Sequence, residues 1–233
     1  MRQKIASITQ WWRIPAACVL CNHYHREEFA VCQSCSALLT RIKHGCSTCR
    51  LPLDNEQVSQ CGYCIKKKPT YDRVLTAYSF EEPLRALLHE FKYREALYLR
   101  TYMAKLMLDA KPPGYYRPDC LVPIPMHPTR LRERGFNQAA ELTKILARRL
   151  HIPFDLTLCE KTINTTAQVH LGSKHRNRNL QKAFVAKPCT FRHITLVDDL
   201  LTTGSTANAL ALALKKQGVT RVDIWCLART PAS

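Results

Sequence analysis

The chain has 233 residues, of which 46% are hydrophobic and 23% are charged, so it can bury a core and does not have the composition of a disordered protein. Its formal net charge of +17 favours polyanionic partners such as nucleic acid or phosphorylated metabolites. No apolar run approaches the roughly 18 residues of a membrane helix, and no export signal is evident. We therefore expect a cytoplasmic protein without stable membrane insertion.

The first part of the chain is rich in cysteine, with four Cys-x-x-Cys pairs at nearly even spacing. Each pair offers two thiolates to one metal ion, and two pairs complete the tetrahedral sulfur site that zinc prefers. One such pair could be a redox motif, but four in succession predict two structural zinc ions. The expected ligands are Cys18, Cys21, Cys32, Cys35, Cys46, Cys49, Cys61 and Cys64.

Two arrangements of these ligands fit the spacing. Consecutive pairs can share an ion, which gives two zinc ribbons in series, or the sharing can be interleaved, which gives a crossed module. Consecutive sharing is favoured because each closed loop is then shorter and costs less entropy. A complete sulfur cage leaves no coordination position for a substrate, so the predicted role is structural rather than catalytic.

The composition changes after the basic run Ile65–Pro69, and we predict a zinc-binding module in residues 1–68 and an α/β domain in residues 69–233. In chain order, the domain's apolar patterns predict a strand at Tyr71–Phe80, helices at Pro83–Lys92 and Leu97–Ala110, a strand at Cys120–Pro125, a helix at Asn137–Leu150, a strand at Phe191–Val197, a helix at Ser205–Gly218 and a strand at Arg221–Leu227. This alternation predicts a mostly parallel sheet flanked by helices.

The segment Thr195–Thr206, TLVDDLLTTGST, carries the clearest chemical signal. A buried strand ends in Asp198 and Asp199, at the edge where open α/β sheets bind ligands. The small-residue turn that follows opens a helix, whose amino end offers N–H groups and partial positive charge to a phosphate. Gly204 permits a close backbone approach. The carboxylates can accept hydrogen bonds from sugar hydroxyls and help to hold Mg²⁺.

Two other interpretations of this segment compete. An apolar strand ending in two aspartates also occurs as the magnesium-binding strand of a P-loop NTPase. That interpretation requires G-x-x-x-x-G-K-[ST], which the chain does not contain. The second is an ordinary strand, turn and helix with solvated acids, which the run of threonine, serine and glycine after two acids makes less favourable.

The segment resembles the phosphoribosyl pyrophosphate (PRPP) signature of type I phosphoribosyltransferases. The stretch PIPMHPTRLRERGFNQ at residues 123–138 and the cysteine-rich start are similar to the ComF family of bacterial competence proteins. The resemblance implies a type I phosphoribosyltransferase-like sheet preceded by a double zinc ribbon. It also implies PRPP and Mg²⁺ as ligands, and a role in natural transformation, in which single-stranded DNA is imported and handled in the cytoplasm with other DNA-uptake proteins.

The resemblance also assigns roles to residues. Asp198 and Asp199 are the expected catalytic pair, which holds the ribose. Arg132 and Arg134 add positive charge, while Phe136, Asn137 and Gln138 either contact ligand or cap and anchor the following helix. The expected residues for PRPP and its phosphates are Thr202, Thr203, Gly204, Ser205, Thr206, Pro125, Met126, His127 and Arg130.

The stretch Lys161–Phe184 is similar to the family's mobile loop, although Lys161 and Ile163 stand where the family usually has arginine. No acidic residue occurs between Glu160 and Asp198. The stretch is interpreted as a polyanion track or a lid over pyrophosphate, against the alternative of a solvated basic loop. Its candidate residues are Lys161, Gln168, Lys174, Arg176, Arg178 and Asn179.

Two functions remain open on the sequence alone. The first is a PRPP-binding protein of DNA uptake, with Tyr93, Tyr98, Tyr115 and Tyr116 as candidates for stacking on bases. The second is a metabolic phosphoribosyltransferase, unrelated to DNA, that releases pyrophosphate from PRPP. No acceptor site is identifiable in the sequence, so the acceptor stays open, as do the oligomeric state and turnover itself.

Overall fold

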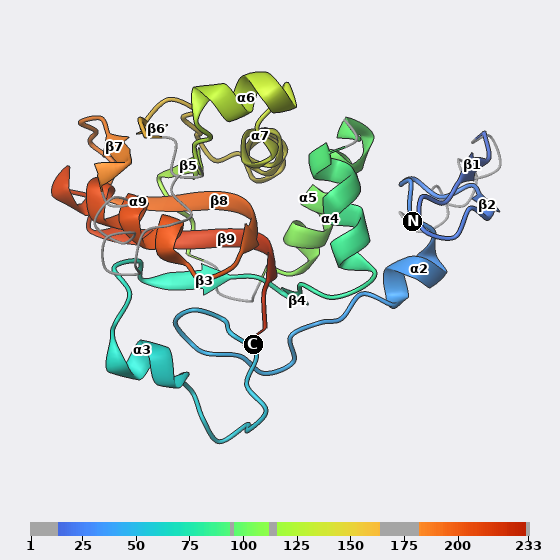
Figure 1. Ribbon diagram of the computed structural model, residues 1–233, viewed down its shortest axis with the longest axis horizontal. Helices are drawn as coiled ribbons and strands as arrows, with labels where there is room; N and C mark the ends of the chain where they lie inside the picture. Colours follow the sequence, from blue (N-terminus) through green and yellow to red (C-terminus); the bar gives the residue numbers. More distant parts are fainter. Residues whose placement is uncertain (1–13, 94–95, 112–115, 164–181, 232–233) are drawn as a thin grey trace.

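The computed structural model describes residues 14–93, 96–111, 116–163 and 182–231. Its centre is a parallel sheet in the order β3 (Arg73–Leu75), β9 (Arg221–Arg229), β8 (His193–Leu201) and β5 (Cys120–Pro123), and β4 (Tyr78–Ser79) also pairs with β9 (Figure 1). Both long strands are almost wholly buried because each has a neighbour on both sides and apolar residues on both faces.

Helices cover the two faces of this sheet. Val197 and Trp225 share a core with α4 (Leu84–Tyr93), with α5 (Arg100–Asp109), which follows a 3₁₀ turn η1 (Leu97–Leu99), and with α7 (Gln138–Leu150). Leu196 and Ile224 share the other core with α9 (Ser205–Lys216) and with the antiparallel pair β6 (Cys159–Lys161) and β7 (Phe184–Ala186). The predicted fold class is thus confirmed.

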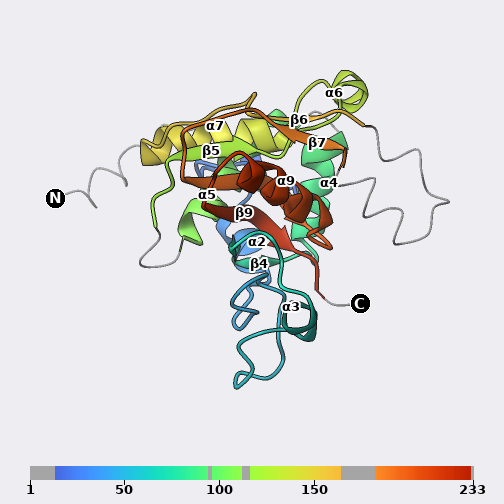
Figure 2. The ribbon, with the colours of Figure 1, turned by 90° about the vertical axis from the view of Figure 1, so that its left-hand side faces the viewer.

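The cysteine-rich part consists of short elements: β1 (Ala16–Ala17) paired with β2 (Tyr24–His25), α2 (Gln33–Ala37) and α3 (Gly62–Lys66). The segment around α3 lies beyond the edge of the sheet formed by β3 and β4 (Figure 2). Main-chain hydrogen bonds join the segments on either side of the predicted domain boundary at residue 68. Ile42 N donates to Ala77 O at 2.8 Å, and Ser79 N donates to Thr40 O at 2.9 Å. The domain division at residue 68 stays a prediction.

Several elements differ from those expected. The strand expected at Tyr71–Phe80 is interrupted between β3 and β4, where Ala77 O accepts a hydrogen bond from Ile42 N of the cysteine-rich part. Helix α6 (Pro128–Arg134) and the β6–β7 pair were not predicted. Strand β8 continues past Val197 to Leu201, because Leu200 and Leu201 pair with the end of β9. Among the helices of the described residues, none has both the length and the apolar character to span a membrane.

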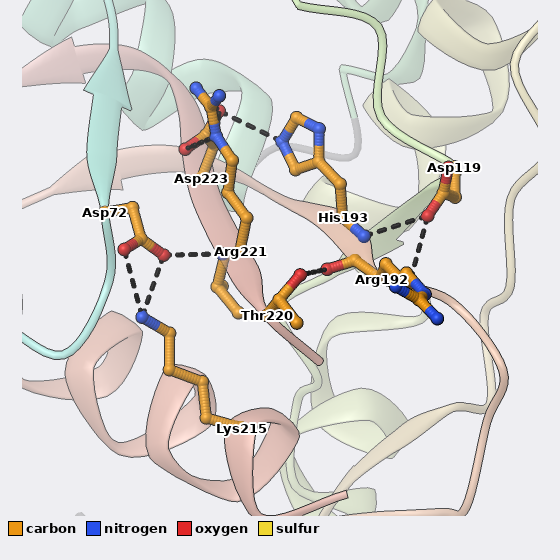
Figure 3. Close-up of polar contacts among 9 residues, drawn as sticks. Asp72, Asp119, Arg192, His193, Lys215, Thr220, Arg221 and Asp223 are labelled. Carbon is orange, nitrogen blue, oxygen red and sulfur yellow. Dashed lines mark hydrogen bonds and ion pairs between the residues drawn. The ribbon is translucent and has the colours of Figure 1, made fainter. Parts of the chain in front are cut away.

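The amino ends of β8 and β9 are tied by a network of polar contacts (Figure 3). Asp223 is buried and accepts hydrogen bonds from His193 Nε2 at 3.1 Å and from Arg221 Nη2 at 2.9 Å. Asp119 Oδ2 accepts from the main-chain N–H groups of Arg192 and His193, at 2.8 and 2.9 Å. Burial alone would raise the pKa of Asp223, but the hydrogen bonds from His193 and Arg221 outweigh it and lower that pKa.

We expect Asp223→Asn to lower the free energy of unfolding at neutral pH by about 3 kcal/mol, because it leaves Arg221 without its buried anion. The stabilisation depends on the charged carboxylate. It is complete above the ordinary carboxyl pKa and is lost as the pH falls through the lowered folded-state pKa. The difference between wild type and variant should therefore shrink below about pH 4 in denaturant titrations. A difference that stays constant with pH would contradict this assignment.

Candidate functional site

The two aspartates lie in β8 itself, at the carboxyl end of the sheet. The apolar pattern predicted a strand ending at Val197, just before the two aspartates, and this boundary was wrong, since β8 runs to Leu201. The pairing of β8 with β5 does stop at Val197, opposite Pro123, so Asp198 and Asp199 project past the end of β5. Their carboxyl groups lie close enough to interact, because the charge and the side chain of Asp199 both act on Asp198. Asp199 is buried and Asp198 is partly exposed.

The surroundings of the two carboxylates differ. Lys92 Nζ, from the last turn of α4, lies 3.0 Å from Asp199 Oδ2. Asp198 Oδ1 accepts a hydrogen bond from the main-chain N–H of Asp199 at 2.9 Å, while burial and the charge of Asp199 raise the pKa of Asp198 to about 8. A hydroxyl donor or a cation placed against Asp198 would therefore stabilise its charged form. No sequence pattern indicated a role for Lys92, which looked like an ordinary last-turn lysine.

The turn after β8 leads into α9, and its backbone can be approached closely because a glycine stands at the helix start. Gly204 has φ of 75° and caps α9. A Cβ there would lie 3.2 Å from the hydroxyl of Tyr71, so both the backbone conformation and the packing require glycine. Thr203 Oγ1 accepts a hydrogen bond from Ser205 N at 3.3 Å and lies 2.9 Å from Ser205 Oγ. Thr202 is exposed, and Thr206 lies in the first turn of α9.

A small hollow of about 50 Å³ adjoins this turn. One wall comes from the turn and the start of α9, and the other comes from α3 and the basic run Ile65–Pro69. Lys67 and Lys68 thereby lie beside the predicted phosphate turn. The lining residues are Tyr63, Lys67, Lys68, Pro69, Tyr71, Thr203, Gly204, Ser205, Asn208 and Ala209.

The loop Pro125–His127 follows β5, next to β8, since Ile124 N donates to Val197 O at 2.9 Å. His127 caps α6 through Nδ1, which accepts from Thr129 N at 3.3 Å. Asn137 caps α7 by accepting from Ala139 N at 3.0 Å, and its Nδ2 donates to Ile124 O at 3.1 Å. Asn137 thus has the capping and anchoring contacts that were weighed against ligand binding.

The other two residues of this stretch also make contacts within the fold. Gln138 is buried and accepts from Arg134 Nη1 at 3.2 Å. The ring of Phe136 packs against that of Phe91, with the centroids 5.9 Å apart.

A larger hollow of about 710 Å³ opens between this loop, α6, α7 and β6. Pro125, Met126 and His127 line it together with Lys161. Burial and the nearby charge of Arg130 lower the pKa of Lys161, so the structure brings these two predicted cationic residues close together. The Lys161 ammonium also lies 5.6 Å from the centre of the Phe184 ring.

The structure does not unite all the predicted residues in one cavity. Among the described residues, the two hollows share no lining residue, and neither Asp198 nor Asp199 lines either of them. The predicted loop residues Gln168, Lys174, Arg176, Arg178 and Asn179 lie outside the described residues, as does Tyr115.

The eight cysteines form two four-sulfur clusters, and consecutive pairs share each cluster: Cys18, Cys21, Cys32 and Cys35, then Cys46, Cys49, Cys61 and Cys64. The sulfur atoms of Cys21 and Cys32 are 3.9 Å apart, and those of Cys49 and Cys61 are 3.6 Å apart. A tetrahedron with metal–sulfur bonds of about 2.3 Å has an edge of roughly 3.8 Å. Each cluster can therefore hold one zinc ion, as in a double zinc ribbon.

No family model matches the chain. Among curated proteins, it is 33% identical over 224 residues to DNA utilization protein YhgH of Escherichia coli K12, which covers 93% of this chain and 98% of that protein. It is 32% identical over 222 residues to competence protein F of Haemophilus influenzae, covering 91% and 96% of the two chains. It is 26% identical over 205 residues to competence protein ComFC of Bacillus subtilis, covering 81% and 79%.

Among solved structures, the chain is similar to the glutamine PRPP amidotransferase of Bacillus subtilis in complex with ADP and GMP. The TM-score is 0.37 and the identity 16%, over 54% of this chain and 25% of that chain.

We expect the purified protein to contain two zinc ions per chain, and Cys21→Ser and Cys64→Ser each to reduce the content to about one, because each removes a ligand from a different cluster. Metal analysis of the purified proteins measures this. Cys189→Ser is the matched control, since Cys189 belongs to neither cluster, and it should keep both ions. A variant of either cluster that retains two ions would contradict the assignment.

Proposed function

The chain belongs to the family of DNA utilization protein YhgH and competence protein F, and we propose that it binds PRPP at the end of β8 and acts on single-stranded DNA during natural transformation. The observation that carries the proposal is the pair Asp198 and Asp199 followed directly by the turn at Gly204 and the start of α9. The cytoplasm is the proposed location, because imported single strands are handled there.

The aspartate pair suits the ribose of such a ligand. A sugar with two neighbouring hydroxyls needs two acceptors at the carboxyl end of the sheet, and Asp198 and Asp199 both lie past the end of β5. Lys92 neutralises Asp199 at 3.0 Å, whereas its charge lowers the pKa of Asp198 too little to offset burial and the charge of Asp199. In the proposed complex, ribose hydroxyls or Mg²⁺ would supply the missing stabilisation.

The turn suits the 5-phosphate of the same ligand. The amino end of α9 carries partial positive charge, and the positive φ of Gly204 brings the backbone close without a side chain in the way. Lys67 and Lys68 add two full charges beside Thr203 and Ser205. These groups together can hold a dianionic phosphate more strongly than the helix end alone.

The loop Pro125–His127 and its neighbours suit the pyrophosphate. Arg130 and Lys161 lie close to each other beside this loop, and their mutual repulsion would be relieved by a bound anion. The oxygen donors of PRPP and of the aspartates are of the type that Mg²⁺ prefers, and the ion would neutralise charge on the pyrophosphate. If the bond to pyrophosphate breaks, these groups stabilise the charge on the leaving group.

The charge of the chain supports the proposed DNA partner. At +17 it attracts a polyanion, and α6 carries Arg130, Arg132 and Arg134 on one short helix. The exposed ring of Tyr93 lies beneath the guanidinium of Arg134, 5.1 Å from ring centre to Cζ. An exposed aromatic ring beside arginine is the pairing on which bases of single strands stack.

We expect wild type to bind PRPP more tightly with Mg²⁺ than without it, and Asp198→Asn to weaken binding about 10- to 100-fold, because a hydrogen bond to a charged group contributes roughly 1.5 to 3 kcal/mol. Titration calorimetry measures both. Asp119→Asn serves as the control, since Asp119 lies at the opposite, amino end of β8. The absence of PRPP binding by wild type would refute the proposed ligand.

We expect single-stranded DNA affinity to fall steeply with salt, and Arg176→Glu with Arg178→Glu to weaken it further and flatten the salt dependence by removing phosphate contacts. Fluorescence anisotropy with a labelled oligonucleotide measures this. Arg148→Glu with Arg149→Glu, two exposed arginines at the far end of α7, is the matched control. Pyrophosphate release with a small acceptor, in a protein that does not bind DNA, would favour the metabolic alternative.

A further inference from the structure

Arg229 connects the second cysteine cluster to the predicted phosphate turn. It is the last residue of β9, and its side chain is buried. Its Nε donates to Cys49 O at 3.2 Å, and its Nη1 donates to Leu201 O at 3.1 Å and also to Thr202 O. Nη1 further donates to Thr230 O at 3.1 Å. All four acceptors are main-chain carbonyls, so this guanidinium holds backbone segments together rather than binding side chains.

The two ends of this connection belong to different parts of the molecule. Cys49 is a ligand position of the second cluster, whereas Leu201 ends β8 and Thr202 begins the turn that leads to Gly204. A guanidinium is planar and rigid, so it fixes the relative position of the carbonyls that share it. The position of the turn therefore depends on where the main chain at Cys49 is held.

A second contact runs in parallel. Tyr71 is buried in the same apolar cluster as Cys49 and Cys64, and its hydroxyl lies beneath Gly204. Thr70 N donates to Asn208 Oδ1 in the first turns of α9. The chain that leaves the second cluster thus supports the turn and the start of α9 directly.

The first cluster has a different environment. Cys18, Cys32 and Cys35 pack in the other core, with Tyr102 of α5, whose hydroxyl donates to Ser36 Oγ at 2.8 Å. That contact leads to α5 rather than to the end of β8. The chain therefore contains two similar cysteine clusters. Among the described residues, only the second is connected to the turn, through Arg229 and Tyr71.

We propose that Arg229 is a positioning residue that makes phosphate binding at the turn dependent on metal in the second cysteine cluster. A bound ion fixes the turn from Cys46 to Cys49 and with it the carbonyl of Cys49. Without the ion this carbonyl moves, and Arg229 then loses one of the acceptors that hold its guanidinium against Leu201 and Thr202. The inference rests on the proposed function for the identity of the ligand, but the coupling itself does not.

The sharpest test compares two arginines with the same chemistry. Arg50 also donates to main-chain carbonyls, across the predicted boundary to Thr76 O at 3.3 Å and within the cysteine-rich part to Ile42 O at 3.2 Å, but neither acceptor belongs to the turn. Arg229→Lys keeps the positive charge but loses the planar guanidinium, whose several N–H groups donate in fixed directions. It should weaken PRPP binding at least roughly tenfold, while Arg50→Lys should change it by less than about twofold. Equal effects of the two variants would overturn the proposal.

Hydrogen exchange gives a readout that needs no ligand. In the full-length protein, we expect Cys61→Ser, which removes a ligand of the second cluster, to speed amide exchange in residues 201–206 several-fold, and Arg229→Lys to do the same. Cys21→Ser, which removes a ligand of the first cluster, should leave exchange there unchanged. Unchanged exchange in both Cys61→Ser and Arg229→Lys would overturn the coupling.

Measurements of PRPP binding and of hydrogen exchange together distinguish a wrong ligand from a wrong coupling. If wild type does not bind PRPP while exchange responds as expected, the proposed ligand is wrong and the coupling holds. If wild type binds PRPP and Arg229→Lys binds it equally well, the proposed function holds and the positioning role of Arg229 is wrong. Metal analysis of each variant confirms which cluster has lost its ion.

Discussion

The pairing of β8 with β9 is the constraint on which the rest of the structure depends. These two strands run side by side from His193 and Arg221 to Leu201 and Arg229, and they form the middle of the sheet. Because β5 pairs with β8 only as far as Val197, the last residues of β8 project beyond it. The same pairing therefore builds the core and places two acidic residues at the edge where a ligand can reach them.

Two adjacent carboxylates at this edge repel each other, and the fold stabilises their two negative charges unequally. Asp199 has Lys92 as its ion-pair partner, while Asp198 accepts a main-chain N–H and keeps a raised pKa, because burial and the charge of Asp199 outweigh the charge of Lys92. The amino end of the same strands holds an acidic residue in the opposite situation. There, Asp223 is fully matched by His193 and Arg221, and its pKa is lowered. A matched acid stabilises the fold, whereas an unmatched one is suited to a ligand.

Much of this was predictable from local sequence patterns. The alternation of apolar strands with helices gave the sheet, and the Cys-x-x-Cys spacing gave two clusters, because both signals are local. Lys92, Lys67 and Arg229 could not be found in this way. Each lies beside a segment far away in the sequence, and each looks locally like an ordinary charge at the end of an element. The end of β8 was misplaced for the same reason, since pairing with β9 overrides the polar character of Asp198 and Asp199.

The two cysteine clusters are not appendages of the domain but parts of its two cores. Cys18, Cys32 and Cys35 pack in the core of α4, α5 and α7, and the second cluster packs in the core of α9. A metal ion in either cluster therefore stabilises one face of the sheet. In the part of the chain that the structure describes, only the face with α9 leads to the predicted phosphate turn, through Arg229 and Tyr71. In the proposed coupling, metal in the first cluster holds the fold, whereas metal in the second also sets the geometry of the predicted phosphate turn.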